Sequence, residues 1–216
     1  MVANLNKRLV TSLILFLLLF GIFKSNYLLV FTLLIFGPLS LIEFFSLTKK
    51  VSINKNLNIL INFCFTIYVF SFCILFFFFS NFIQLKMILF SLLLCCISSD
   101  IGGYTIGNLI KGPKLTKISP NKTISGAIGS IIFSLLFFSL AIYLFTANFS
   151  YKIILIGIVT SIFCQIGDLF FSFLKRRAKI KDSGNFLPGH GGILDRLDGI
   201  FLGIPAGFFT LVYVIK

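Results

Sequence analysis

Acidic side chains are scarce in this 216-residue chain, so their positions are informative. The sequence has six Asp and Glu residues against 19 Lys and Arg residues. Asp100 and Asp168 end or interrupt apolar segments, where an ionised carboxylate costs about 2.5–3.5 kcal/mol on membrane-insertion scales. Asp195 and Asp198 stand three residues apart and share one face if a helix has begun there. Carboxylates in such an arrangement are typical ligands of a hard cation such as Mg²⁺.

Each of these acids also has a plainer structural interpretation. Asp100 precedes two glycines and fits a membrane interface, where a charge costs little. Asp195 and Asp198 could compensate the positive end of a helix, which stabilises it by about 0.3–1 kcal/mol, and Arg196 could pair with either. We favour metal or phosphate chemistry for them because carboxylates are so rare elsewhere in the chain.

Asp168 begins a polar stripe on a predicted helix. Ser172 and Lys175 follow it at helical spacing, so the three side chains share one face about two turns long. A deep carboxylate with a shallower cation suits a site that holds a metal ion beside phosphates. Lys175 could equally anchor the helix end by extending its ammonium group to the membrane surface, and one residue can do both.

The segment from Ser172 to Gly199 is the densest in polar residues. It contains six Lys or Arg residues, three Asp residues and the only His of the chain, His190. Its basic run alone indicates membrane topology or contact with anionic lipid. The glycines around His190, which include Gly191 and Gly192, permit positive φ and can aim successive N–H groups at an anion.

A second polar segment runs from Asp100 to Gly126 and is interspersed with lysines. Ser119 or Thr123 could cap the helix that follows. A helix N-terminus beside lysines is also a natural place for a triphosphate.

The elements that position these residues are predicted to be membrane-spanning helices. Hydrophobic residues make up 58% of the chain and charged residues only 12%, which excludes an ordinary soluble domain. The five cysteines lie in apolar runs without a CxxC pair, so neither a disulfide framework nor a zinc site is expected. A spanning helix needs about 20 apolar residues. Seven segments qualify: Leu9–Phe23, Tyr27–Leu47, Leu57–Phe79, Phe82–Ser99, Thr123–Phe145, Tyr151–Leu174 and Gly199–Ile215.

The distribution of basic residues predicts the orientation of these helices. The first segment resembles a signal peptide, but no small-residue cleavage site follows it, so we expect it to be retained. With seven spans, 15 of the 19 Lys and Arg residues fall on the side of the N-terminus. The positive-inside rule then places the N-terminus inside, the C-terminus outside, and both polar segments on a cytoplasm-facing cavity. The net charge of +13 is therefore attributed to cytoplasmic loops and a polyanionic substrate, not to nucleic acid.

Both polar segments resemble the signature of the phosphatidate cytidylyltransferases, or CDP-diacylglycerol synthases. That signature is long, with mixed residue types at fixed gaps. The later segment fits it at Ser172, Lys175, Arg176, Lys181, Asp182, Gly184, Leu187, Pro188, His190, Gly191, Gly192, Asp195, Arg196 and Asp198. The earlier one fits at Asp100, Gly102, Tyr104, Gly107, Lys114, Leu115, Ile118, Ser119, Pro120, Lys122, Thr123 and Gly126, and departs at Gly103, Asn121 and Ser125. The resemblance covers the second half of the chain.

The resemblance implies an enzyme of phospholipid biosynthesis that joins CTP to phosphatidic acid, giving CDP-diacylglycerol and pyrophosphate. It implies a divalent cation, Mg²⁺, held by the acid before the Ser-x-x-Lys-Arg motif and the first acid after His-Gly-Gly. These are Asp168 and Asp195. Whether a second cation assists is left open.

The remaining site residues follow from the same resemblance. Lys175 and Asp198 join the two metal acids as catalytic residues, with Asp100 and Asp182 as supporting acids. The expected substrate-binding residues are Lys114, Ser119, Lys122, Thr123, Ser172, Arg176, Lys181, His190, Gly191, Gly192 and Arg196.

The sequence therefore predicts an all-α, multi-pass protein of the inner, cytoplasmic membrane. Residues 1–99 would form a helical scaffold, and residues 100–216 would form the catalytic region of a single membrane domain. Expected partners are CTP, phosphatidic acid and membrane lipids, and dimers are common among such enzymes. Two alternatives stay open: transfer to another lipid acceptor, such as an ether lipid or a polyprenol, and an ion-coupled transporter using Asp168 and Asp100.

Overall fold

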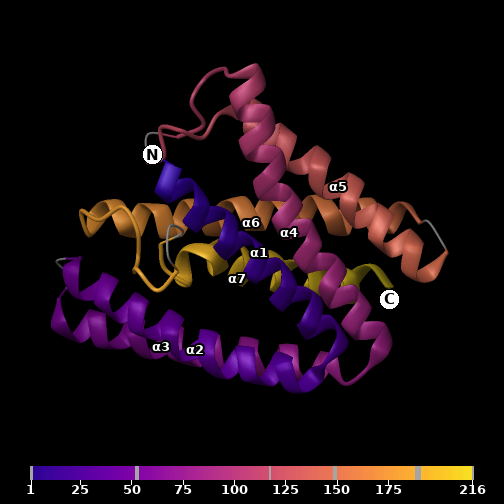
Figure 1. The fold of residues 1–216 in the computed structure, drawn as a ribbon, viewed down its shortest axis with the longest axis horizontal. Coiled ribbons are helices and arrows are strands. Elements are labelled where there is room, and N and C mark those ends of the chain that lie inside the picture. The colour runs from indigo at the N-terminus through magenta and orange to yellow at the C-terminus, as the bar shows by residue number, and fades with distance from the viewer. Residues whose placement is uncertain (1, 52–53, 117, 148–149, 188–190, 216) are drawn as a thin grey trace. The chain divides into compact units, whose positions relative to one another are not determined.

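The protein is all-helical throughout the part of the chain that its structure, a computed structural model, describes (Figure 1). This part comprises residues 2–51, 54–116, 118–147, 150–187 and 191–215. Side chains are described from residue 10 to residue 214 within these ranges. The helices are α1 (Val2–Lys24), α2 (Asn26–Lys50), α3 (Lys55–Ser80), α4 (Ile83–Ile110), α5 (Ile124–Thr146), α6 (Tyr151–Arg177) and α7 (Leu194–Ile215).

These helices confirm the predicted polytopic membrane architecture. Six of the described helices, α2 to α7, are long and apolar enough to cross a bilayer, and α1 carries a shorter apolar stretch, Val10–Lys24. The orientation of these helices in the membrane, with the N-terminus inside, stays a prediction.

Several helices extend beyond the apolar segments that predicted them, α4, α6 and α7 among them. Helix α4 continues to Ile110, although its apolar run ends at Ser99. Helix α6 retains Lys175, Arg176 and Arg177 in its last turn, where cations interact favourably with the helix dipole. Helix α7 begins at Leu194, five residues before the predicted span. Hydropathy reports the apolar length of a segment, whereas a helix continues as long as its backbone hydrogen bonds do.

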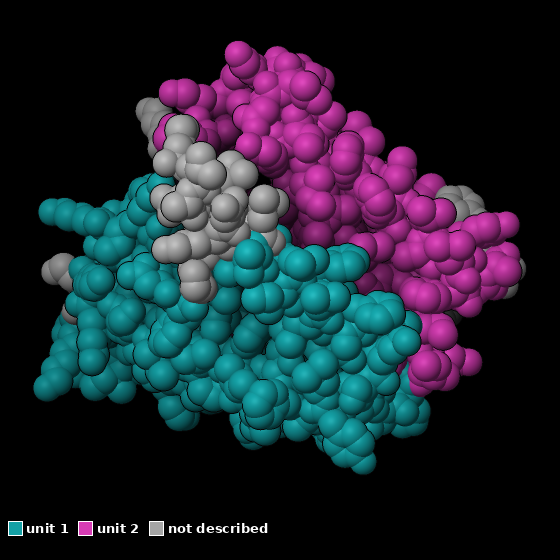
Figure 2. All heavy atoms as spheres, in the orientation of Figure 1, with its two compact units in different colours: residues 1–82, 174–197 teal, residues 83–173, 198–216 magenta. Residues whose placement is uncertain are grey.

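The chain divides into two compact units (Figure 2). Unit 1 comprises residues 1–82 and 174–197, and unit 2 comprises residues 83–173 and 198–216. The functional division of the sequence at residue 100 stays a prediction.

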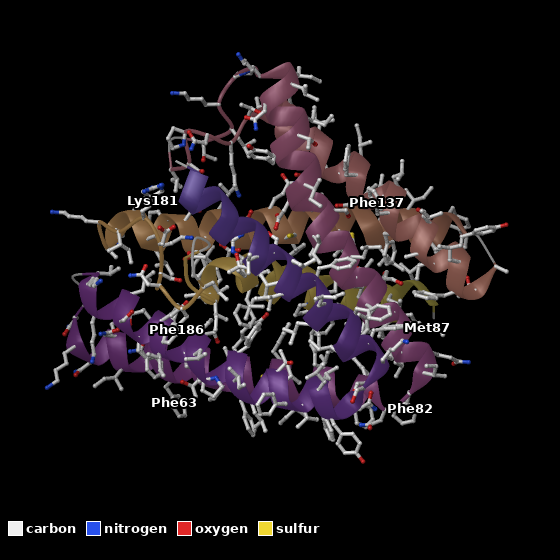
Figure 3. The ribbon with its side chains drawn as sticks, in the orientation of Figure 1. Phe63, Phe82, Met87, Phe137, Lys181 and Phe186 are labelled. Carbon is white, nitrogen blue, oxygen red and sulfur yellow. The ribbon has the colours of Figure 1, made fainter. Side chains whose placement is uncertain are left out.

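In unit 1, α2 and α3 lie side by side (Figure 1). The rings of Phe44 and Phe65 stack with centroids 3.8 Å apart. The Thr48 hydroxyl donates a 2.9 Å hydrogen bond to Oδ1 of Asn62. Aromatic side chains such as Phe63, labelled in Figure 3, are exposed, as expected of a lipid-facing surface. The end of α2 packs through Leu47 against Ala178, which follows α6.

In unit 2, α4 and α5 approach backbone to backbone close to the loop that joins them (Figure 1). A Cβ atom added to Gly102 would lie 2.5 Å from the carbonyl oxygen of Gly129, and one added to Gly126 would lie 2.8 Å from that of Gly103. Only glycine allows such proximity. This crossing fixes the start of α5 against the end of α4, and with it the loop between them.

Candidate active site

In unit 2, Asp168 on α6 is paired with a lysine from the loop of residues 111–123. The Lys122 ammonium group donates a 2.9 Å hydrogen bond to Oδ2 of Asp168, and the two side chains are 30% and 22% exposed. The two residues are 46 positions apart in the chain. The structure thus brings together two predicted site residues, Lys122 of the earlier polar segment and Asp168, which precedes the later polar segment by four residues.

Backbone hydrogen bonds hold the 111–123 loop in a hairpin-like form. The N–H of Leu115 donates to the carbonyl oxygen of Lys122 at 2.8 Å, and the N–H of Ile124 donates to that of Pro113 at 3.0 Å. Thr123 caps α5, because its hydroxyl accepts a 3.1 Å hydrogen bond from the N–H of Gly126. Of the two predicted caps Thr123 is confirmed. Ser119 instead accepts, through its carbonyl oxygen, the N–H of Lys122 at 3.1 Å.

The predicted phosphate-binding lysine Lys114 lies on the exposed side of this loop. It forms an isolated bridge with Thr123 and lines a shallow hollow together with Leu115, Thr116 and Pro120. Lys114 is the charged residue among those that line the hollow.

In unit 1, Asp195 in the first turn of α7 is enclosed by hydrogen-bond donors. The Lys175 ammonium group lies 2.7 Å from its Oδ1, and Oδ2 accepts the N–H groups of Ser183 at 2.8 Å and Gly192 at 3.0 Å. The side chains of Lys175 and Asp195 are only 12% and 8% exposed. The predicted stripe of Asp168, Ser172 and Lys175 does lie on one helix, α6, but the ion-pair partner of Lys175 is Asp195.

A further acid, Glu43 on α2, was missed by the sequence analysis as a site residue. It is 2% exposed, and its carboxylate accepts hydrogen bonds from the Ser183 hydroxyl and from the N–H groups of Ile193 and Leu194. The N–H groups of residues 192 to 194 thus do point at anions, as the glycine pattern predicted, and these anions are carboxylates of the protein itself. The cost of a lone acid in an apolar segment was the signal that could have revealed Glu43.

The other predicted site residues are distributed as follows. Arg176, Lys181 and Asp182 are exposed and Ser172 is half-buried. Lys181, labelled in Figure 3, belongs to the loop between α6 and α7, and Arg196 is exposed in the first turns of α7. Asp198 is 9% exposed and accepts a 2.9 Å hydrogen bond from the N–H of Gly199. Asp100 is exposed on α4, and Gly191 has a φ of +83°. His190 lies outside the described residues.

The donor set around the two predicted metal ligands is compatible with a hard cation. Asp168 and Asp195 offer carboxylate oxygens, which Mg²⁺ prefers, and each already neutralises a positive ammonium group. Among the described residues, no group of three or more His, Cys, Asp or Glu side chains is close enough to hold a metal without other ligands. A cation bound by either carboxylate would therefore complete its shell with water and substrate oxygens, as Mg²⁺ usually does.

Comparison with known proteins identifies the family. Residues 4–214 match the model of the cytidylyltransferase family, so the chain belongs to that family. A phosphatidate cytidylyltransferase of Bacillus subtilis is 42% identical over 116 residues, which cover 53% of this chain and 43% of the relative. One of Staphylococcus haemolyticus is 43% identical over 123 residues, covering 56% and 47%. One of Helicobacter pylori is 37% identical over 126 residues, covering 58% and 47%.

The chain spans about half the length of the curated relatives it matches. The activity and substrates of these relatives are therefore proposals for this chain.

Proposed function

We propose that this protein transfers a cytidylyl group from CTP to phosphatidic acid at the cytoplasmic face of the inner membrane, forming CDP-diacylglycerol and pyrophosphate. The single observation that carries the proposal is the pair of carboxylate–lysine contacts, Lys122–Asp168 and Lys175–Asp195, in a chain of the cytidylyltransferase family. Lys122, Lys175 and Asp195 belong to the polar segments, and Asp168 lies four residues before the later one. Each contact would combine a cation-binding carboxylate with a phosphate-binding lysine.

The reaction requires charge neutralisation more than proton transfer. The phosphate of phosphatidic acid is largely ionised near neutral pH and is already a nucleophile. One of its oxygens forms a bond to the α-phosphorus of CTP while the bond from that phosphorus to the bridging oxygen of pyrophosphate breaks. The barrier comes from the repulsion between two polyanions and from the charge that develops on pyrophosphate. Positioning and electrostatic stabilisation therefore supply most of the catalysis.

The roles of the residues follow from this requirement. Asp168 and Asp195 would hold Mg²⁺, which when bound neutralises phosphate oxygens and the leaving pyrophosphate. Lys122 and Lys175, which lie beside these carboxylates, would bind phosphate oxygens of the substrates. Lys114, in the same loop as Lys122, would add a further positive charge. Diacyl tails would reach the site from the lipid between helices.

The test is an assay in sealed membrane vesicles that contain the protein, with labelled CTP and several lipid acceptors. Because CTP does not cross a bilayer, inside-out vesicles should form a lipid-soluble cytidine product and right-side-out vesicles should not. Phosphatidic acid should be the preferred acceptor over an ether-lipid or polyprenyl phosphate. No product with any acceptor would refute the activity, a preference for another acceptor would refute the substrate, and product in right-side-out vesicles would refute the orientation.

A further inference from the structure

Glu43 connects α2 to the loop between α6 and α7, which we call the 178–193 loop. Its Oε1 accepts the N–H of Ile193 at 3.1 Å, and its Oε2 accepts the Ser183 hydroxyl at 2.9 Å and the N–H of Leu194 at 2.8 Å. The donors are 140 to 151 positions away in the chain. A carboxylate at 2% exposure with three donors is a strong, specific tether, because hydrogen bonds to charged groups are stronger than those between neutral groups.

The loop is shaped closely around this carboxylate. A Cβ atom added to Gly184 or to Gly192 would collide with the carboxylate oxygens of Glu43. Both glycines therefore allow the loop backbone to approach the acid more closely than any other residue would. The fit is a property of the loop sequence and of α2 together, although the two lie far apart in the chain.

Ser183 joins Glu43 to Asp195. Its hydroxyl donates to Glu43, and its N–H donates to Oδ2 of Asp195 at 2.8 Å. Gly192 donates its N–H to the same Oδ2 atom, and the next two N–H groups, of Ile193 and Leu194, donate to Glu43. The N–H groups that bind Asp195 thus come from Ser183, whose hydroxyl Glu43 holds, and from Gly192, whose next two residues Glu43 holds.

We propose that Glu43 is a positioning residue, which holds Ser183 and the first turn of α7 so that the Asp195 carboxylate keeps the orientation needed to bind a cation. The inference rests on the proposed function only for the role of Asp195. The inference that Glu43 orders the 178–193 loop rests on the hydrogen bonds alone.

The substitution Glu43→Gln changes the hydrogen bonds of this side chain and keeps its shape. Gln has almost the same volume, so the contacts with Gly184 and Gly192 are retained. Its amide offers one oxygen and one NH₂ group, and the NH₂ group would oppose an N–H donor of Ile193 or Leu194. Ser183→Ala removes only the hydroxyl bond to Glu43. The matched control is Thr48→Val, which removes a hydrogen bond from an equally buried residue of α2 that contacts Asn62 on α3.

Backbone hydrogen–deuterium exchange of the full-length protein in detergent measures the tether directly. In Glu43→Gln, the amides of residues 183–187 and 191–194 should exchange about tenfold faster, because each bond to a charged group stabilises the closed loop by at least that factor. Ser183→Ala should show a smaller increase, and Thr48→Val should leave the loop unchanged. Unchanged loop exchange in Glu43→Gln, or equally faster exchange throughout α2 and α3, would overturn the proposal.

Magnesium dependence of turnover then tests the link to Asp195. Substitution of a residue that orients a metal ligand typically weakens metal affinity about 10–100-fold, so Glu43→Gln should raise the half-saturating Mg²⁺ concentration by about tenfold or more. The KM for the lipid should stay within about twofold, and Glu43→Asp should recover part of the loss. A lower kcat with an unchanged Mg²⁺ requirement would mean a reduced folded fraction and would contradict the proposal. If the wild type makes no cytidine lipid, the proposed function fails, and the exchange result still decides whether Glu43 orders the loop.

Discussion

The Lys175 ammonium group lies 2.7 Å from Oδ1 of Asp195, and both side chains are nearly enclosed. Because both charged groups are largely shielded from water, each is stabilised mainly by the other. Because the same carboxylate also accepts two backbone N–H groups, the end of α6 and the start of α7 are joined through one acid.

Lys175→Met should therefore destabilise the protein markedly. Removal of one member of a buried ion pair costs about 3–5 kcal/mol, because the remaining charge stays buried without its partner. Unfolding by titration with SDS measures the loss. The double variant Lys175→Met/Asp195→Asn should recover part of it, and Lys50→Met at the exposed end of α2 should change stability by less than about 0.5 kcal/mol. Equal stability of the Lys175 and Lys50 variants would contradict the buried-pair interpretation.

Lys122→Met should lower stability only slightly and activity strongly. Its pair with Asp168 is partly exposed, and such pairs contribute only about 0.2–1 kcal/mol to stability. Loss of a group that stabilises developing phosphate charge costs about 10²–10³-fold in turnover. SDS unfolding and the labelled-CTP assay, run on Lys122→Met and on Lys152→Met as control, should separate the two effects. Unchanged turnover, or a stability loss large enough to explain the lost turnover, would refute the role of Lys122.

Gly102→Ala should disrupt the crossing of α4 and α5. Its new Cβ would lie 2.5 Å from the carbonyl oxygen of Gly129, which is backbone and cannot move aside. Overpacking of this kind costs about 1–3 kcal/mol. Gly37→Ala is the control, since its Cβ would meet side-chain atoms alone, the Cys73 sulfur at 3.3 Å and Cγ1 of Val69 at 3.9 Å. Both changes gain the helix propensity of alanine equally, so the difference between their unfolding midpoints isolates packing. Equal midpoints would contradict the close crossing.

Much of the fold could be predicted from apolar runs alone, because the bilayer requires long helices and leaves few alternatives. The extension of α4 past Asp100 could not, since its glycines and polar residues are as compatible with a loop as with a helix. At the site, scarcity of carboxylates singled out Asp168 and Asp195. Their lysine partners depend on tertiary packing and are not encoded in local spacing.

Glu43 shows the limit of reading polar segments one at a time. It lies in neither polar segment, and its three donors come from the other end of the chain. The insertion cost that drew attention to Asp168 applies to Glu43 as well. Its partners, however, could be identified only once α2 and the 178–193 loop were placed together in unit 1.

The central proposal, which comes from the sequence resemblance, is that Asp168 and Asp195 bind the same cation, and Mn²⁺ binding tests it most directly. Electron paramagnetic resonance of the purified protein with CTP would count tightly bound Mn²⁺ in the wild type, in Asp168→Asn, in Asp195→Asn and in the double variant. If one ion is shared, each single variant should lose the same ion, the double variant should lose no more, and Mg²⁺-dependent turnover should vanish in all three. Retention of that ion by either single variant, additive losses in the double variant, or near-wild-type turnover would contradict the claim.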